Sequence, residues 1–272
     1  MIFDLHIHTN YSDGLFTPEE IVDLAIKKKL NGIAITDHDT IDGIESAMAY
    51  NNNLIDSIYI IPGIEFGCIY KNEEVHILGY FIDYKSSKII NLSKELKRNR
   101  IDRSLKIIDK LNKIGFKIKM EEIEILTKGG YIGRPHIAKI LVEKGYVNNI
   151  YNAFKLYLNR GRPGYVEKKS LNINETIDLI HELNGIAVLA HPGLLKDKTI
   201  INYCIEANID GLEAIHSKHN MKDIEFLLNI GEKNSLIITA GSDCHGHIVN
   251  GEYLLGKYYI NLNSIPLMKR RI

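Results

Sequence analysis

Short apolar segments alternate with helical patterns along most of the chain, and this alternation constrains the fold more than any other feature. The apolar segments predict strands at residues 2–5, 33–36, 58–61, 75–81, 186–190, 211–215, 236–240 and 255–262. Helices are predicted between them, at about 18–29, 41–50, 173–183, 197–207 and 220–231. Strands that alternate with helices form a parallel sheet or barrel, so we expect an α/β protein.

The alternation stops between residues 85 and 166. Ile107, Ile108, Leu111 and Ile114 follow helical spacing there, and no convincing buried strand interrupts the pattern. We therefore expect a barrel domain from residues 1–84 and 167–272, and an inserted helical subdomain from residues 85–166.

Composition limits the cellular setting and the partners. The 272 residues carry no formal net charge, so no overall attraction to nucleic acid or membrane is expected. Cys68, Cys204 and Cys244 are odd in number and widely spaced, which does not suggest a disulfide framework. We find no basic leader before an apolar run and no apolar segment of about 18 residues. The expectation is a cytoplasmic protein with no membrane contact and no obligate protein partner.

Metal-binding residue types recur at or near the ends of the predicted strands. His6 and His8 lie two apart on one strand, so their side chains point the same way. Any one histidine alone would more often be structural, but the series is hard to explain without metal. Nine candidate ligands form it: His6, His8, Asp13, His38, Glu65, His76, His191, Asp243 and His245.

Six imidazoles and three carboxylates suit zinc, manganese or iron. Nine ligands exceed what one ion uses, so the sequence predicts two or three divalent ions. A carboxylate such as Glu65 can bridge two ions about 3.5–4 Å apart.

These motifs resemble, in order and along nearly the whole chain, those of the PHP (polymerase and histidinol phosphatase) superfamily of metal-dependent phosphoesterases. The matching segments are His6-x-His8, Asp13, Thr36-Asp37-His38-Asp39, Glu65, His76, His191-Pro192 and Ser242-Asp243-x-His245. The resemblance implies a distorted (β/α)7 barrel, the PHP fold, with a trinuclear site.

By that resemblance, His6, His8, Glu65 and Asp243 hold one ion. Glu65, His76 and His191 hold a second, and Asp13, His38 and His245 hold a third. The expected catalytic group is a metal-bound hydroxide held by Glu65, His191 and Asp243, which attacks phosphorus in line. Asp39 is expected to orient His38.

A second motif, Gly133-Arg134-Pro135-His136, begins a helix of the predicted insert. Arg134 can bind a phosphate through its planar fork, and His136 can donate to one, although a solvated helix cap remains an alternative. The motif and the insert resemble one PHP branch, the 3′,5′-nucleoside bisphosphate phosphatases, which includes 5′→3′ exoribonucleases. That resemblance implies that the insert caps the site and that Arg134 and His136 contact substrate phosphate. His219, close to a strand end beside His216, is a further candidate for substrate binding.

The predicted function is hydrolysis of phosphate monoesters, above all the 3′-phosphate of nucleoside 3′,5′-bisphosphates such as pAp. Short RNA degraded from its 5′ end is a further candidate substrate. Two alternatives stay open. One is a histidinol-phosphate phosphatase, against which the insert motif argues. The other is a catalytically silent PHP module that binds metal or nucleic acid, against which the complete ligand set argues.

Overall fold

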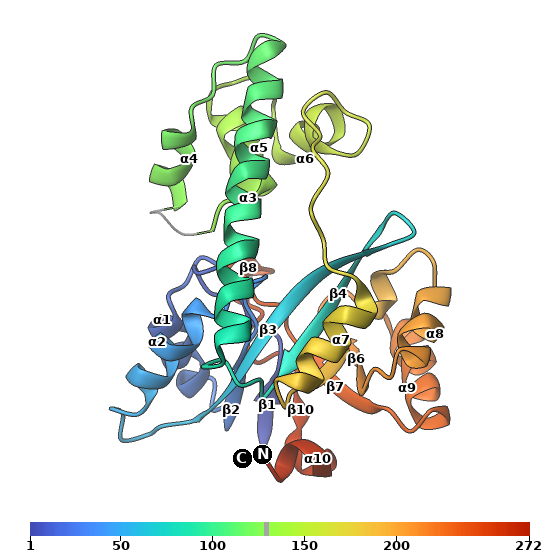
Figure 1. The fold of residues 1–272 in the computed structure, drawn as a ribbon. Helices are drawn as coiled ribbons and strands as arrows, with labels where there is room; N and C mark the ends of the chain where they lie inside the picture. The colour runs from blue at the N-terminus through green and yellow to red at the C-terminus, as the bar shows by residue number, and fades with distance from the viewer. Residues whose placement is uncertain (128–130) are drawn as a thin grey trace. The chain divides into compact units, whose positions relative to one another are not determined.

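The computed structural model describes residues 1–127 and 131–272 of the chain (Figure 1). The chain divides into two compact units. The barrel unit contains residues 1–93 and 170–272, and the helical unit contains residues 94–169. The expected insert began at residue 85 and ended at 166, so the boundaries differ from the prediction at both ends.

The barrel unit is built around one sheet, which contains eight strands among the described residues, in the order β10-β1-β2-β3-β4-β5-β6-β7. Their bounds are β1 Ile2–Asp4, β2 Gly32–Ile35, β3 Tyr59–Tyr70, β4 Glu73–Tyr80, β5 Ile186–Leu189, β6 Gly211–His216, β7 Ile237–Gly241 and β10 Ile260–Asn261. A separate two-stranded sheet pairs β8 Ile248–Val249 with β9 Glu252–Tyr253.

The sheet closes almost completely on itself. The Leu5 amide donates to the Ala240 carbonyl (3.1 Å), and the His8 amide donates to the Cys244 carbonyl (3.0 Å), which links the chain beyond β1 to β7. Of the seven neighbouring pairs among the described strands, four are parallel, whereas β4 runs antiparallel to both β3 and β5, and β10 runs antiparallel to β1. The predicted distorted α/β barrel is confirmed, and its antiparallel pairs depart from a regular parallel barrel.

Two strand predictions were wrong in extent. β3 does not end near residue 61 but continues to Tyr70, because it forms an antiparallel hairpin with β4. The final strand was predicted at 255–262, but β10 contains only Ile260–Asn261, because it pairs with the short β1 only at Ile2 and Phe3.

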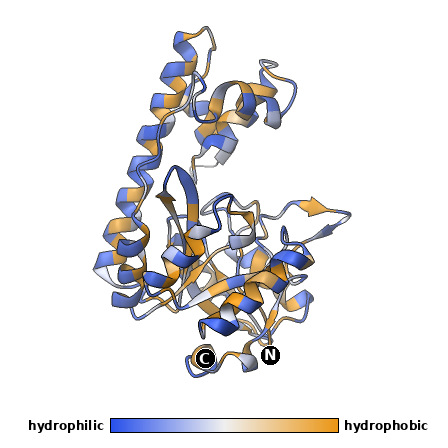
Figure 2. Ribbon diagram, turned by 90° about the vertical axis from the view of Figure 1, so that its right-hand side faces the viewer, coloured by the Kyte–Doolittle hydropathy of each residue, from blue (hydrophilic) through white to orange (hydrophobic). Residues whose placement is uncertain are grey.

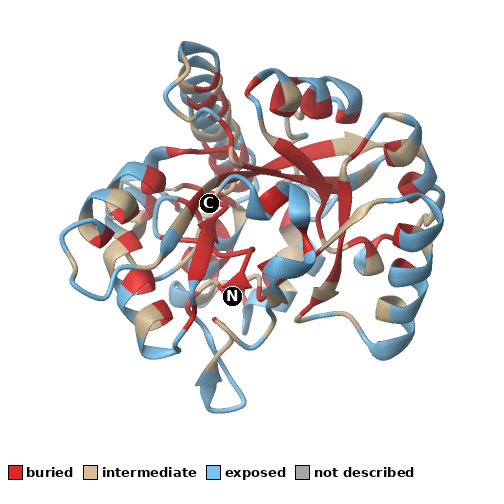
Figure 3. Ribbon diagram, turned by 90° about the horizontal axis from the view of Figure 1, so that it is seen from below, coloured by how far each residue is buried: buried red, intermediate tan, exposed pale blue. Residues whose placement is uncertain are grey.

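Helices cover the outside of the sheet, and the strands are its most buried elements (Figure 3). They are α1 Pro18–Lys27, α2 Asp42–Asn51, α7 Ile173–Glu182, α8 Thr199–Glu206, α9 Met221–Lys233 and α10 Pro266–Lys269, with short helical turns η2 Pro192–Leu194 and η3 Leu262–Ser264. Thr17 caps α1 in a reciprocal capping box with Glu20. The helices carry both hydrophobic and hydrophilic residues (Figure 2), as expected of elements with one buried face.

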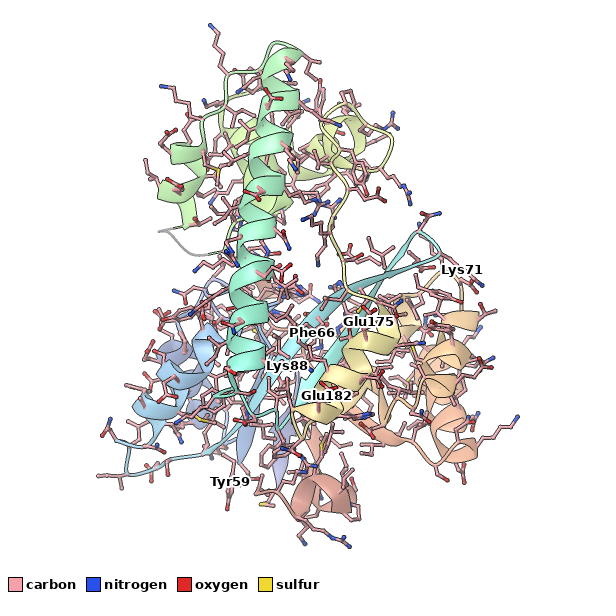
Figure 4. The ribbon with its side chains drawn as sticks, in the orientation of Figure 1. Tyr59, Phe66, Lys71, Lys88, Glu175 and Glu182 are labelled. Atoms are coloured by element: carbon pink, nitrogen blue, oxygen red, sulfur yellow. The ribbon has the colours of Figure 1, made fainter. Side chains whose placement is uncertain are left out.

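The helix α3 Ser87–Lys113 passes from one unit into the other. Its first turns belong to the barrel unit, where Ile89 is buried and the Ser93 hydroxyl contacts that of Thr40 (3.5 Å). Lys88 forms an ion pair with Glu182 of α7, and the two side chains meet in Figure 4. These contacts explain why the division falls at residue 93 rather than where the helix begins.

The helical unit has a core of its own. Beyond α3 it contains α4 Met120–Thr127, α5 Arg134–Glu143, α6 Ile150–Ala153 and the π-helical turn η1 Phe154–Leu158. Leu111, Ile123, Ile137, Leu141 and Leu158 are buried together among these elements. Among the helices described in either unit, none is long and apolar enough to cross a membrane.

Candidate metal centre

The Glu65 carboxylate is the centre of the site and is only 1% exposed. It lies in the middle of β3 rather than at a strand end as predicted, since β3 continues into the hairpin with β4. Five histidine rings surround it, with Oε2 near His6 Nε2 (3.3 Å), His8 Nε2 (3.3 Å) and His38 Nδ1 (3.0 Å), and Oε1 near His76 Nδ1 (2.8 Å) and His191 Nε2 (3.0 Å).

Strand register explains how distant residues converge on Glu65. His38 follows β2 and forms a parallel bridge with Glu65 itself. His76 lies inside β4, which runs antiparallel to β3 and pairs His76 with Gly67, so the hairpin returns it to the same end of the barrel. His191 follows β5, whereas His6 and His8 follow β1. The parallel strands therefore present their carboxyl ends at one place.

A second group forms around Asp13, in the loop after β1. Its Oδ1 lies 3.2 Å from His245 Nε2 and 3.7 Å from His8 Nδ1, and its Oδ2 lies 3.9 Å from His38 Nε2. One ligand atom from each of these four residues lies within 4.8 Å of the others. The structure thus brings Asp13, His38 and His245 together, as the predicted third ion requires.

Asp243 completes the arrangement from the end of β7. Its Oδ1 lies 3.2 Å from His8 Nε2 and 3.6 Å from His6 Nε2. Both Asp243 (φ +53°) and His191 (φ +34°) have left-handed backbone conformations, which non-glycine residues rarely adopt. Backbone strain of this kind gathers at functional sites.

Several polar atoms of the centre are buried without a hydrogen-bond partner. Within the part of the chain that the structure describes, they include His6 Nε2, His8 Nε2, Asp13 Oδ1 and Glu65 Oε2. Buried polar atoms are costly unless something satisfies them. Imidazole and carboxylate donors that converge in this way fit divalent zinc, manganese or iron.

Charge coupling dominates the electrostatics of the centre. Burial alone would raise the pKa of Glu65, but the surrounding histidines, His38 first, lower it well below the usual value. Burial would lower the pKa of His8 and His76, but the nearby carboxylates raise both to about 10. Burial lowers the pKa of His191 to about 4. His8 and His76 therefore hold protons that a cation would displace.

Three buried acids that support the centre were missed as site residues. Glu213 of β6 contacts His6 Nδ1 (3.0 Å) and accepts the His191 amide (2.8 Å). Asp4 accepts the Ser242 amide (2.9 Å), and Asp37 accepts the Thr9 amide (2.7 Å). Asp4 and Glu213 could have been recognised from the sequence, because each is a charged residue within a predicted apolar strand.

His219 has both ring nitrogens engaged by backbone. Its Nδ1 donates to the Ala214 carbonyl (2.9 Å), and its Nε2 accepts the Gly193 amide (3.0 Å). The ring therefore holds the turn that follows His191, and its role in substrate binding stays a prediction. Asp39 accepts the Gly67 amide (3.1 Å), and its expected role in orienting His38 also stays a prediction.

Arg134 and His136 lie in the first turn of α5, in the helical unit. The Arg134 guanidinium lies over the Phe154 ring (5.7 Å to its centre). His136 Nδ1 accepts the Gly133 amide (3.2 Å), so the neutral ring carries its proton on Nε2. That nitrogen is a hydrogen-bond donor, which suits contact with an anion.

Known proteins are similar along most of the chain. The PHP domain matches residues 4–158. The 5'-3' exoribonuclease Rnm of Escherichia coli (strain K12) is 33% identical over 250 residues, covering 90% of this chain and 85% of that protein. The 3',5'-nucleoside bisphosphate phosphatase of Chromobacterium violaceum is 29% identical over 248 residues, covering 89% and 86%. A Bifidobacterium adolescentis crystal structure, provisionally assigned as a metal-dependent phosphoesterase, has a TM-score of 0.86 and 28% identity and covers 99% and 96%.

Proposed function

This chain is a phosphoesterase of the PHP domain family, and we propose that it removes the 3′-phosphate from nucleoside 3′,5′-bisphosphates. The observation that carries the metal-dependent chemistry is the buried Glu65 carboxylate enclosed by five histidine rings, and the 29% identity to a 3',5'-nucleoside bisphosphate phosphatase supports the substrate. Short RNA, degraded from its 5′ end, is a second candidate substrate, supported by the 33% identity to an exoribonuclease.

We propose two or three divalent ions at this centre. The distances support His6, His8, Glu65 and Asp243 around one ion and Glu65, His76 and His191 around a second. Asp13, His38 and His245 would hold a third, which the closeness of their ligand atoms supports. Glu65 would be shared between the first two, because its two oxygens face different histidines.

When bound, such ions supply a water nucleophile near neutral pH and neutralise charge on the phosphoryl oxygens. We place the reacting water beside Glu65, His191 and Asp243. Asp243 Oδ2 also lies 3.1 Å from Lys218 Nζ, so the positively charged Lys218 side chain lies at the exposed side of the centre. The chain itself fixes the ligands, since the backbone that bears them is held by Asp4, Asp37 and the sheet.

Arg134 and His136 are the proposed contacts for a second phosphate. Arg134 offers a planar fork that can bind two phosphate oxygens, and His136 offers its Nε2 proton. The amides in the first turn of the ten-residue helix α5 add the positive end of the helix dipole, which favours an anion. The predicted role of the insert as a cap over the site belongs to the same proposal.

The cysteines support a reducing compartment, and we propose the cytoplasm. Cys68, Cys204 and Cys244 are all buried, and within the described residues none of them forms a disulfide. Burial raises the pKa of the Cys204 thiol to about 12, so that thiol is chemically inert at neutral pH.

Substrate choice tests the proposed function. We expect a higher kcat/KM for pAp than for 3′-AMP or 5′-AMP, because a monophosphate would lack the second phosphate that Arg134 and His136 are proposed to bind. The assay compares pAp, 3′-AMP, 5′-AMP, histidinol phosphate and a 5′-phosphorylated short RNA at equal metal loading. Equal values would indicate an indiscriminate phosphatase, and preference for histidinol phosphate would replace the proposed substrate.

The variant Arg134→Ala tests the proposed contact between Arg134 and the second phosphate. A charge-assisted contact is worth ~1.5–3 kcal/mol, so kcat/KM for pAp should fall roughly 10- to 150-fold. The fall in kcat/KM should be much smaller for the monophosphates. Arg134→Lys should recover little of the kcat/KM for pAp, because lysine lacks the planar guanidinium that binds two oxygens. Lys139→Ala is the matched control, since Lys139 is an exposed cation of the same helix that pairs with Glu143. An unchanged value for pAp would remove Arg134 from the site.

A further inference from the structure

Strand β6 brings two buried polar side chains, Glu213 and His216, to the metal centre. Residues three apart on a regular strand point to opposite faces. Here the pairing of β6 with β7 shifts register between Glu213 and Ile215. This bulge adds one residue and reverses the alternation, so that both side chains face the centre. Each is 0% exposed, and neither is among the nine predicted ligands.

Glu213 selects which nitrogen of His6 is available. Its Oε1 and Oε2 lie 3.0 and 3.2 Å from His6 Nδ1, and a carboxylate at that distance holds the proton on Nδ1. In the neutral ring the lone pair is then on His6 Nε2, which faces Glu65 (3.3 Å) and Asp243 (3.6 Å). Glu213 Oε2 also accepts the His191 amide (2.8 Å), which secures a backbone in the left-handed region.

His216 has the opposite hydrogen-bond pattern. Its Nδ1 accepts the amide of Lys218 (3.2 Å), so the proton of the neutral ring lies on Nε2. That nitrogen is within ion-pair distance of Asp243 Oδ2 (3.4 Å), although the two atoms are not aligned for a hydrogen bond. A protonated nitrogen has no lone pair for a metal, although His6, His216 and Asp243 lie close enough together to hold one. The other oxygen of Asp243 faces His6 and His8.

We propose that Glu213 and His216 are positioning residues, which hold His6 and Asp243 in the form that binds metal. Glu213 keeps the lone pair of His6 on Nε2. His216 would donate its Nε2 proton to Oδ2 of Asp243 and leave Oδ1 directed at the ligand histidines. The bulge in β6 is the structural device that permits both roles from one strand. The proposal rests on the metal site proposed above and is independent of the substrate.

Metal affinity tests the proposal directly. Chelator competition with Zn²⁺ or Mn²⁺ should show about 10- to 100-fold weaker binding for Glu213→Gln and for His216→Leu, with the number of ions unchanged. His216→Gln should recover most of the affinity, because its amide can donate to Asp243 in place of Nε2. The visible absorption of Co²⁺-loaded protein should change in Glu213→Gln and His216→Leu.

His181→Leu is the matched control. His181 Nε2 pairs with Asp210 Oδ2 (2.8 Å), and that carboxylate also accepts the Ala187 amide at the start of β5. This pair is also a histidine with a carboxylate, but it includes none of the proposed metal ligands. Its loss should therefore alter Tm without altering metal affinity or the Co²⁺ spectrum.

Three outcomes would overturn the proposal. Wild-type affinity and spectra in Glu213→Gln and His216→Leu would show that neither residue positions a ligand. The loss of one equivalent of metal in both His216 variants would make His216 a ligand instead. A wild-type protein that binds no metal would overturn the metal site as well, whereas the first two outcomes leave that site standing.

Discussion

Glu65→Gln is expected to lower kcat/KM for pAp by on the order of 10³-fold or more and to reduce the number of bound ions. Glutamine keeps the shape of the side chain but removes the charge that faces five histidine rings. It can no longer offer both oxygens to two ions. Activity and elemental analysis of the same preparation measure the two effects together.

The control for this variant is Glu175→Gln, an exposed glutamate on α7 (Figure 4), which should retain full activity and metal. Asp243→Ala should lose activity by several orders of magnitude as well, with the barrel still folded by circular dichroism. A Glu65→Gln protein with more than a tenth of wild-type activity and a full complement of metal would contradict the shared role of Glu65.

The second large effect is a rise of metal affinity with pH. His8 and His76 have pKa values raised to about 10, so in the metal-free protein both are protonated across pH 6 to 8. A ligand nitrogen must lose its proton to bind metal, and each displaced proton changes the apparent affinity about tenfold per pH unit. His191, with its pKa lowered to about 4, is already neutral and releases no proton in this range.

The affinity of the ion that His6 and His8 bind should therefore strengthen by at least about 100-fold between pH 6 and 8, because His8 releases one proton and His6, whose pKa is also raised by Glu213 and Glu65, adds to the slope. Chelator competition at pH 6, 7 and 8 measures the slope, and calorimetry in buffers of different ionisation enthalpy counts the protons released. A slope near zero would show that His8 and His76 are neutral before metal arrives. Glu65 and Asp243, with pKa values lowered far below neutrality, remain ionised throughout and do not contribute to the slope.

Local pattern was enough to predict which metal-binding side chain types come together in the structure. The two-residue spacing of His6 and His8 correctly predicted that both rings point the same way, since both present Nε2 to Glu65. Alternating strands and helices correctly predicted the barrel, because each element is short and strongly patterned. Ligand types at strand ends then converge as a consequence of parallel register.

Features that depend on pairing between distant strands were not predictable in this way. The hairpin of β3 and β4 places Glu65 and His76 inside strands, and its antiparallel register cannot be read from either segment alone. The bulge that turns Glu213 and His216 inward depends on how β6 meets β7. The unit boundary at residue 93 lies within the continuous helix α3, where the helical pattern does not change but the tertiary contacts do.

Metal stoichiometry tests the central claim most directly. Protein purified without chelator, and then reconstituted separately with Mn²⁺, Zn²⁺ and Fe²⁺, is analysed for bound metal per chain. The nine side chains gathered around Glu65 and Asp13 predict two or three equivalents with at least one of these ions. Less than one equivalent after every reconstitution would contradict a multinuclear metal centre.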